Sequence, residues 1–223
     1  MLYVYAFIGG LIPALLWLWF WLQEDRLHPE PKRYLFFTFL GGMIAVVMVL
    51  PVEAFIFKRL GLGLSTIALW AFFEELFKFG AAYLIAIRYR VNDEPIDAVI
   101  YLITAALGFA ALENMFFLLD PLQSNQLVHT VVTGNLRFLG ASILHTLSSA
   151  TIGIVMAYAF FKNKLSKRVV IVIGLILATV LHTLFNFFII QNKGAQTFLV
   201  FFGVWIAVIA LILIFEKVKR IHK

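Results

Sequence analysis

Long apolar runs separated by short polar connections dominate the chain. Each run is about twenty residues long, enough for an α-helix to cross a hydrocarbon core of roughly 30 Å. The connections include "EDRLHPEPKR", "RYRVNDEP" and "KNKLSKR". The pattern predicts an all-α fold, a polytopic membrane helix bundle of about seven transmembrane helices, near residues 2–23, 34–56, 66–87, 96–119, 138–161, 169–190 and 197–215.

The first run and the connections indicate the domain organisation. Residues 2–22 follow no positively charged segment and contain no small-residue cleavage site, so we expect a retained membrane helix rather than a signal peptide. Among the connections, only 120–137 is long enough to hold an extra surface helix. No internal repeat is apparent, and residues 1–223 are expected to form a single integral-membrane domain.

Composition supports the membrane assignment and excludes some chemistry. The chain is 63% hydrophobic and 13% charged, against roughly 25% charged residues in soluble domains. The net charge of +6 does not indicate nucleic-acid binding, because the basic residues cluster at the ends of apolar runs, as membrane topology requires. The chain has no cysteine, which excludes disulfides, thiolate metal ligands and a cysteine nucleophile.

The distribution of lysine and arginine predicts the orientation. The first, third and fifth connections hold 3, 2 and 4 of them and the C-terminal tail holds 4, whereas the alternate connections hold 2, 0 and 1. The first set thus holds thirteen lysines and arginines and the second holds three, which predicts an N-terminus outside and a C-terminus in the cytoplasm. Two basic residues, Lys78 and Arg137, remain within or at the edge of apolar runs.

Ionisable residues of four predicted helices fall at one depth. With 1.5 Å of rise per residue, Glu74 lies ~12 Å below the outer surface and Glu113 ~9 Å below it. By the same measure, His145 and His182 lie at ~10–12 Å. Each buried charge costs a few kcal/mol in a bilayer, so such a layer indicates a functional site.

Helical spacing favours convergence within this layer. Lys78 lies four residues after Glu74 and three after Glu75, so its ammonium group can partner one carboxylate. Other residues share a helix face with members of this layer: Phe109 lies on the face of Glu113, Ser149 and Gly153 lie on the face of His145, and Asn186 lies on the face of His182. The small residues Ser149 and Gly153 would admit a close neighbouring helix.

Each feature also has a purely structural interpretation. Glu75 and Lys78 could form an interhelical ion pair, and Asn114 could bridge two helices. Glu53 and Asp97 lie near helix ends and are expected to be interfacial. These interpretations do not explain why so many polar residues lie at one membrane depth.

The predicted site contains carboxylates, imidazoles and an amide but no thiol. Such a set suits general-base activation of water. A glutamate would take the proton while His and Asn donors stabilise an oxyanion. The same groups could instead hold a divalent metal, drawn from Glu75, Glu113, His145 and His182, and spacing does not separate the two possibilities.

The sequence lacks the motifs of other intramembrane protease mechanisms and of retinal proteins. The sequence has no H-E-x-x-H helix and no G-x-S-x-G turn. Asp97 and Asp120 lie at opposite ends of one predicted helix, which excludes an aspartyl dyad, and the seventh run has no lysine for retinal.

The ordered motifs "EELFK" (74–78), "GFAALEN" (108–114), "HTLSS" (145–149) and "HTLFN" (182–186) resemble those of the PrsW intramembrane proteases. That family belongs to a superfamily with the type II CAAX prenyl endopeptidases and bacteriocin-immunity proteins. The resemblance covers roughly residues 20–190, with Tyr101 standing where a glycine is common.

The resemblance implies a bacterial plasma-membrane endopeptidase that makes the first, extracytoplasmic cut in a single-pass, membrane-anchored anti-sigma factor during envelope stress. By resemblance, one of the paired glutamates Glu74 and Glu75 activates water, and Lys78 orients or charge-balances a glutamate. Glu113 corresponds to the second-motif acid, while imidazole partners and oxyanion donors are supplied by His145, His182 and Asn186. Phe109, Asn114 and Ser149 are expected to support the site. No cofactor is required on this interpretation, although zinc would suit the same ligands.

Two other classes of protein could use the same polar layer. A proton-coupled transporter would relay protons through these Glu and His residues, usually with inverted repeats and broken helices. A non-proteolytic scaffold would use them to recognise a partner helix. The enzyme hypothesis predicts that Glu75→Gln or His182→Ala abolishes cleavage of a single-pass substrate while leaving the protein folded.

Overall fold

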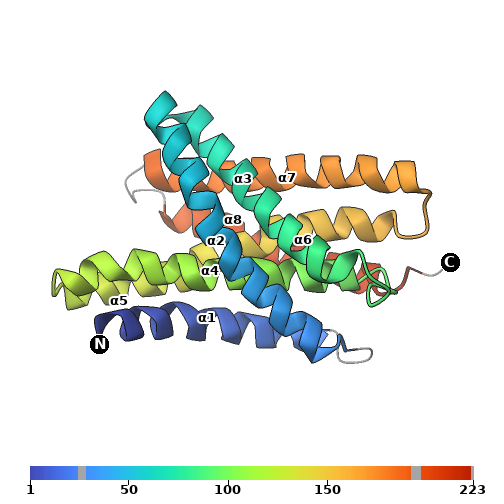
Figure 1. Ribbon diagram of the computed structural model, residues 1–223, viewed down its shortest axis with the longest axis horizontal. Helices are drawn as coiled ribbons and strands as arrows, with labels where there is room; N and C mark the ends of the chain where they lie inside the picture. The colour runs from blue at the N-terminus through green and yellow to red at the C-terminus, as the bar shows by residue number, and fades with distance from the viewer. Residues whose placement is uncertain (25–28, 192–196, 222–223) are drawn as a thin grey trace.

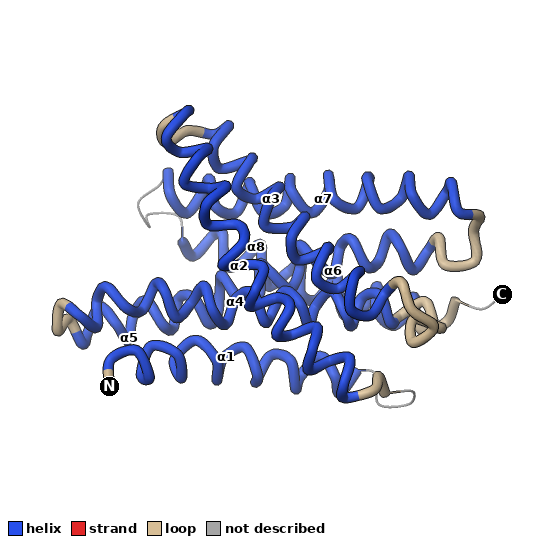
Figure 2. Tube along the Cα trace, in the orientation of Figure 1, coloured by secondary structure: helices blue, strands red, loops and turns tan. Residues whose placement is uncertain are grey.

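A computed structural model describes residues 1–24, 29–191 and 197–221. Within these ranges the secondary structure is helical and no strand occurs (Figures 1 and 2). Two π-helical segments, η1 and η2, extend the ends of α3 and α5. The elements are α1 (Leu2–Glu24), α2 (Lys32–Leu60), α3 (Leu64–Ala82), η1 (Tyr83–Ile87), α4 (Asp97–Gln123), α5 (Leu127–Leu136), η2 (Arg137–Ala141), α6 (Ser142–Tyr158), α7 (Lys164–Gln191) and α8 (Thr197–Val218).

The polytopic all-α prediction is confirmed. Six helices in the described ranges are long and apolar enough to cross a membrane, and one of them joins α5, η2 and α6 into Leu127–Tyr158. The remaining long helix, α3, carries Glu74, Glu75 and Lys78 within 19 residues, which lowers its apolar character. The 120–137 connection, which is long enough for an extra surface helix, contains α5, and α5 continues through η2 into α6 as part of one apolar span.

Helix α4 forms the centre of the bundle. It packs against α1, α2 and α6, and it lies among the other helices in Figure 1. Every residue from Asp97 to Ala111 is buried, so this helix is covered on all sides, as expected for an interior membrane helix. The outer helices expose apolar side chains instead, as lipid contact requires.

Glycines permit the close crossings of α4 with its neighbours. A Cβ atom at Gly42 of α2 would collide with the carbonyl oxygen of Ala105, and one at Gly108 of α4 would collide with that of Phe39. On the other side, a Cβ at Gly153 of α6 would lie 2.6 Å from the Cα of Val99. The close approach predicted at Gly153 is therefore confirmed.

The start of α4 is fixed by local hydrogen bonds. Oδ2 of Asp97 accepts hydrogen bonds from the backbone N–H groups of Asp93 (2.8 Å) and Glu94 (2.7 Å). Tyr101 is fully buried, and its hydroxyl donates to the Glu30 carboxylate. Asp97 thus organises the connection before α4, and Tyr101 ties that helix to the segment before α2.

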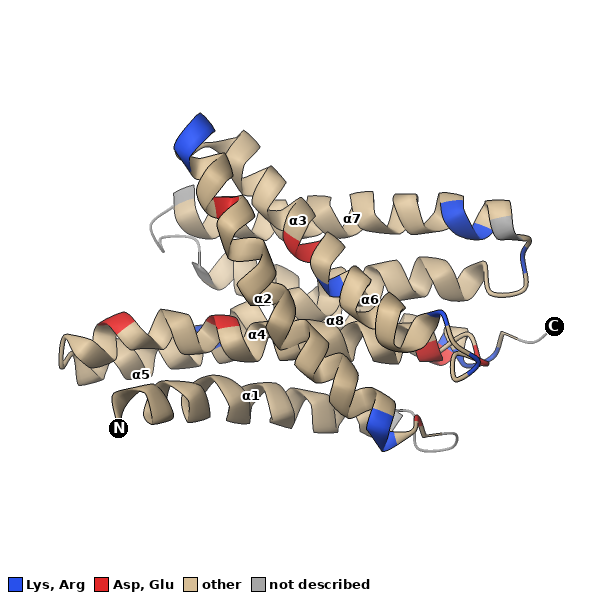
Figure 3. Cartoon of the chain, viewed as in Figure 1, with Lys and Arg blue, Asp and Glu red and all other residues tan. Residues whose placement is uncertain are grey.

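Most lysines and arginines lie at one end of the bundle. Figure 3 shows them concentrated where α1, α3, α6 and α8 end and where α2, α4 and α7 begin. Figure 3 shows acidic positions both at this basic end, where α4 begins with Asp97, and along the middle and opposite half of the molecule on α2, α3 and α4.

Candidate active site

The ionisable residues of α3 form a buried pair. Glu75 and Lys78 are both fully buried, and their Oε1 and Nζ atoms lie 2.6 Å apart. Glu74 Oε2 is farther from the ammonium group, at 3.7 Å. The ion pair expected from the i,i+3 spacing is confirmed, and it compensates the burial of both charges.

Glu75 also holds residues from two other helices. Nδ1 of His182, on α7, donates to Glu75 Oε1 at 2.9 Å. The hydroxyl of Ser149, on α6, donates to Glu75 Oε2 at 2.8 Å. Both carboxylate oxygens are therefore engaged, and the second ring nitrogen of His182, Nε2, is directed toward Glu74 at 3.7 Å from its Oε2.

His145 on α6 connects α3 with α4. The Lys78 ammonium group donates to its Nδ1 at 2.9 Å, while its Nε2 donates to Glu113 Oε2 at 2.9 Å. This pattern places the ring proton on Nε2. Phe109 packs against the imidazole with ring centroids 5.3 Å apart, and the Lys78 Nζ lies 4.6 Å from the centre of the phenyl ring.

Arg137 completes the network from η2. Its guanidinium group pairs with the Glu113 carboxylate, and its Nε donates to Oδ1 of Asn114 at 2.6 Å. The amide of Asn114 then donates to the Ser142 hydroxyl at 3.1 Å. Asn114 therefore bridges α4 to η2 and α6, which is the structural interpretation of this residue, while neither Arg137 nor Ser142 is among the site residues predicted from the sequence.

A cavity of about 610 Å³ opens onto this network. Its polar lining comes from Glu53, Glu74, Glu113, Arg137, His145, His182 and Asn186. Aromatic and aliphatic side chains form the rest of the wall, among them Trp70, Phe116, Phe117, Phe185 and Phe201. An apolar cavity of this size with a few convergent polar groups is typical of a ligand or substrate site.

Glu74 is the acidic residue of α3 that reaches the cavity. Its Oε2 atom is buried and has no hydrogen-bond partner among the described residues. This atom lies 3.8 Å from His145 Nδ1 and 3.7 Å from His182 Nε2. A buried carboxylate oxygen without a hydrogen bond is costly, and the Lys78 ammonium group at 3.7 Å only partly offsets that cost, so this position suits a bound water or cation.

The sequence matches the family model described as PrsW family intramembrane metalloprotease over residues 30–214. The chain belongs to this family. It is 27% identical to Protease PrsW of Halalkalibacterium halodurans over 187 residues, covering 80% of each chain. Identity to Protease PrsW of Clostridioides difficile is 29% over 189 residues, covering 81% of this chain and 77% of the relative. No solved structure matches the chain.

Membership of the PrsW family confirms the resemblance, and with it an intramembrane peptidase in a multi-pass membrane protein. The predicted convergence is confirmed too, because Glu74, Glu75, Glu113, His145 and His182 are joined by direct contacts within 4 Å. Asn186 lines the same cavity. The catalytic roles assigned to these residues remain predictions.

The family description raises the question of a metal. Glu74, His145 and His182 each offer one ligand atom, and these three atoms lie within 4.8 Å of one another. Two imidazoles and one carboxylate form a familiar zinc donor set, and the unpartnered Oε2 of Glu74 suits it. The residues therefore fit a divalent ion, provided that Lys78 releases His145 Nδ1, from which it lies 2.9 Å away.

This set differs from the ligands expected from the sequence. Glu75 and Glu113 had been named as metal candidates, but their carboxylates are occupied. Glu75 is held by Lys78, Ser149 and His182. Glu113 is held by Arg137 and His145. Both acids therefore orient the imidazoles, and Glu74 faces the space between them.

Two site residues were missed for identifiable reasons. Glu53 was expected at the interface, but α2 carries it beside Trp70, whose Nε1 donates to the Glu53 carbonyl at 3.0 Å, and its side chain lines the cavity. Arg137 lies at the edge of an apolar run, and the charge pattern assigns it no partner. A lone arginine within an apolar stretch was the available signal, since such residues usually pair with an acid.

Proposed function

We propose that this chain is an endopeptidase that hydrolyses a peptide bond of a membrane-anchored protein, with Glu74 as the base that activates water. The observation that carries the proposal is the buried, unpartnered Glu74 Oε2 atom between two imidazoles in the cavity. A water molecule placed there would contact a carboxylate base and the Nε2 lone pair of His182. General-base catalysis requires such reach.

The proton and bond changes follow from these positions. Glu74 takes a proton from water, and the water oxygen forms a bond to the scissile carbonyl carbon. The carbonyl oxygen gains negative charge, which is stabilised by the Asn186 amide from the cavity wall. The carbon–nitrogen bond then breaks as Glu74 returns the proton to the leaving amine, giving a carboxylic acid and an amine.

The surrounding groups act on orientation and charge. Glu75 fixes the His182 ring through Nδ1, and Lys78 balances the charge of Glu75. Glu113 holds His145 from the opposite side. As the alternative to Glu74 acting as a free base, a divalent ion held by Glu74, His145 and His182 would supply Lewis-acid polarisation of the scissile carbonyl.

The substrate is proposed to be a single-pass membrane protein, and the family resemblance favours an anti-sigma factor in envelope-stress signalling. The distribution of lysine and arginine predicts an external N-terminus, with the polar layer beneath the external face, and this orientation is part of the proposal. Cleavage would then occur on the extracytoplasmic side. The apolar wall of the cavity suits the side chains of a membrane-embedded segment.

Reconstitution of the purified chain with candidate single-pass substrates tests this function. We expect cleavage by the unmodified protein and a loss of about 100-fold or more for His182→Ala. The matched control is His129→Ala, because His129 lies exposed on α5, outside the cavity. Failure to cleave any candidate substrate while proton flux is observed would favour the transporter alternative.

A chelator separates the two ways of activating water in the same assay. Loss of cleavage on chelation, with recovery on zinc addition, would show that cleavage needs a metal, for which Glu74, His145 and His182 are the proposed ligands. Unchanged cleavage in chelator would support activation by Glu74 alone.

A further inference from the structure

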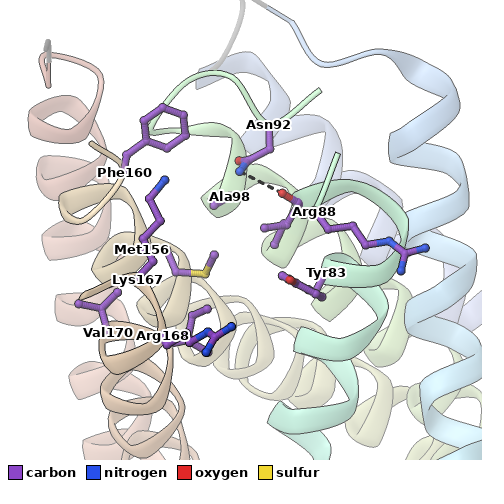
Figure 4. A pocket seen from close by; sticks show the side chains of 11 residues that line it. Tyr83, Arg88, Asn92, Ala98, Met156, Phe160, Lys167, Arg168 and Val170 are labelled. Carbon is purple, nitrogen blue, oxygen red and sulfur yellow. Dashed lines mark hydrogen bonds between the residues drawn. The ribbon is translucent and has the colours of Figure 1, made fainter. Parts of the chain in front are cut away.

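A second cavity lies at the basic end of the bundle, away from the polar layer. Its volume is about 440 Å³. It is bordered by η1, the connection after it, the start of α4, the end of α6 and the start of α7 (Figure 4). None of the residues assigned to catalysis lines it.

The mouth of this cavity is cationic. Lys167 and Arg168, in the first two turns of α7, both line it, and Arg88 lies on the facing side. No carboxylate lines the cavity, and within the described ranges none of these three residues forms an ion pair. Such uncompensated positive charge favours an anionic ligand.

The three cations differ in direction. In Figure 4, Lys167 extends beside Phe160, while Arg168 lies at the edge of the cavity. The Lys167 Nζ atom is 5.2 Å from the Phe160 ring centroid. Arg88 points away from the cavity and donates to the Tyr89 hydroxyl at 2.6 Å. Lys167 and Arg168 are therefore the two charges available to a bound anion.

Apart from Asn92, whose amide donates to the Ile87 carbonyl at 3.2 Å, the remaining wall is mostly apolar and continues onto the lipid-facing surface. Ile87, Met156, Val170 and Ile171 contribute to the cavity. Tyr83 of η1 lines it as well and is 40% exposed. Leu84 of η1 is 55% exposed, and on α7 the exposed fractions are 51% for Val169 and 56% for Val172. A ligand here would thus meet charge at one end and hydrocarbon-compatible surface at the other.

The π-helical segment η1 contributes to the shape of this cavity. A π turn widens the helix, and such turns are frequent at functional sites. Here η1 supplies Tyr83 and Ile87 to the wall. The other π segment, η2, supplies Arg137 and Ala141 to the catalytic cavity. Each π segment in the described chain therefore lines one of the two cavities.

We propose that this cavity binds the headgroup of an anionic phospholipid. The phosphate lies against Lys167 and Arg168, and the acyl chains follow the exposed faces of η1 and α7. Basic pockets between membrane helices bind acidic headgroups in this way, and each nearby cation adds to the attraction. The apolar continuation argues for a lipid rather than free phosphate, which would use only the charged mouth. This proposal is independent of the proteolytic function.

Native mass spectrometry of the purified full-length protein in detergent tests the site. The protein is titrated with phosphatidylglycerol, with phosphatidylethanolamine and with glycerol phosphate, which lacks acyl chains. We expect tighter binding of phosphatidylglycerol than of phosphatidylethanolamine and no displacement by glycerol phosphate. Equal binding of both lipids, or displacement by glycerol phosphate, would overturn the proposal.

A pair of double variants locates the binding. Lys167→Gln with Arg168→Gln is expected to weaken phosphatidylglycerol binding by about tenfold or more. The matched control is Lys32→Gln with Arg33→Gln, an adjacent basic pair exposed in the first turn of α2, at the same end but outside the cavity. The control should stay within about twofold.

Equal losses in the two double variants would contradict the assignment, because general surface charge would then explain the binding. If the α7 double variant does not fold, the single change Arg168→Gln should still weaken phosphatidylglycerol binding about threefold or more relative to Arg33→Gln. Exchange of the two charges, by Lys167→Arg with Arg168→Lys, should preserve the preference.

Discussion

Nδ1 of His182 lies 2.9 Å from Oε1 of Glu75. This hydrogen bond fixes the tautomer of the imidazole and turns Nε2 toward Glu74 Oε2, 3.7 Å away. The two adjacent glutamates of α3 therefore face different surroundings, although they are neighbours in sequence. Glu75 is enclosed by protein donors, and Glu74 opens onto the cavity.

Glu75→Gln should lower the cleavage rate through the orientation of His182. Lys78 and His182 both donate to Oε1, and a neutral amide oxygen at that place accepts these bonds more weakly than a carboxylate does. The amide NH2 also replaces Oε2, which accepts from Ser149, so the imidazole is held less firmly. Loss of such an orienting partner costs about 10- to 100-fold in activity. Steady-state cleavage measurements check this, and a rate within twofold of the unmodified protein would contradict the assigned role.

Lys78→Met should lower the stability of the folded protein. It leaves Glu75 as a buried carboxylate without its cation, and breaking a buried pair in this way costs about 3–5 kcal/mol. Thermal unfolding in detergent measures the effect. The double variant Lys78→Met with Glu75→Gln should recover much of the stability while cleaving no faster than Glu75→Gln alone. Equal stability of the single and double variants would argue against a buried ion pair.

Arg137→Gln should reduce cleavage because Glu113 then lacks its guanidinium partner and no longer holds His145 in place. We expect a loss of about tenfold. Arg137→Lys should recover only part of the activity, since an ammonium group cannot reproduce the fork that contacts both Glu113 and Asn114. Arg59→Gln, at the exposed end of α2, is the control. Comparable rates for the Arg137 and Arg59 variants would contradict this role.

Gly108→Ala should destabilise the helix bundle by about 1–3 kcal/mol, because the added methyl group collides with the backbone of α2 at Phe39. Gly80→Ala in α3 is the matched control, since no atom lies within 4 Å of its added Cβ. The control should be neutral or slightly stabilising, as alanine favours helix. Unfolding temperatures in detergent compare the two, and equal destabilisation would be inconsistent with the α2–α4 contact.

Much of the site could be predicted because a bilayer imposes a common depth scale on separate helices. Segment boundaries and a fixed rise per residue were enough to align Glu74, Glu113, His145 and His182. The Lys78 pairing followed from helical spacing. Depth does not give the direction of a side chain about the helix axis, so the difference between Glu74 and Glu75 needed the packed structure.

The residues that sequence reasoning missed depend on how helices tilt and join. Glu53 reaches the cavity because α2 crosses α4 closely at Gly42 and Gly108, which sets the course of the rest of the helix. Arg137 reaches Glu113 from η2, whose π turn joins α5 to α6 without a break. Neither the crossing nor the π turn has a clear signature in the hydrophobic pattern.

One comparison tests the assignment of the base most directly. It measures cleavage of a reconstituted single-pass substrate by the Glu74→Gln variant and by the Asp120→Asn variant. Asp120 is an exposed acid near the end of α4, outside the cavity, so its change matches the loss of charge without touching the site. We predict a fall of at least about 100-fold for Glu74→Gln, with its melting temperature retained, and a rate within twofold of the unmodified protein for Asp120→Asn. A folded Glu74→Gln variant that cleaves at the rate of the Asp120→Asn control would contradict the assignment.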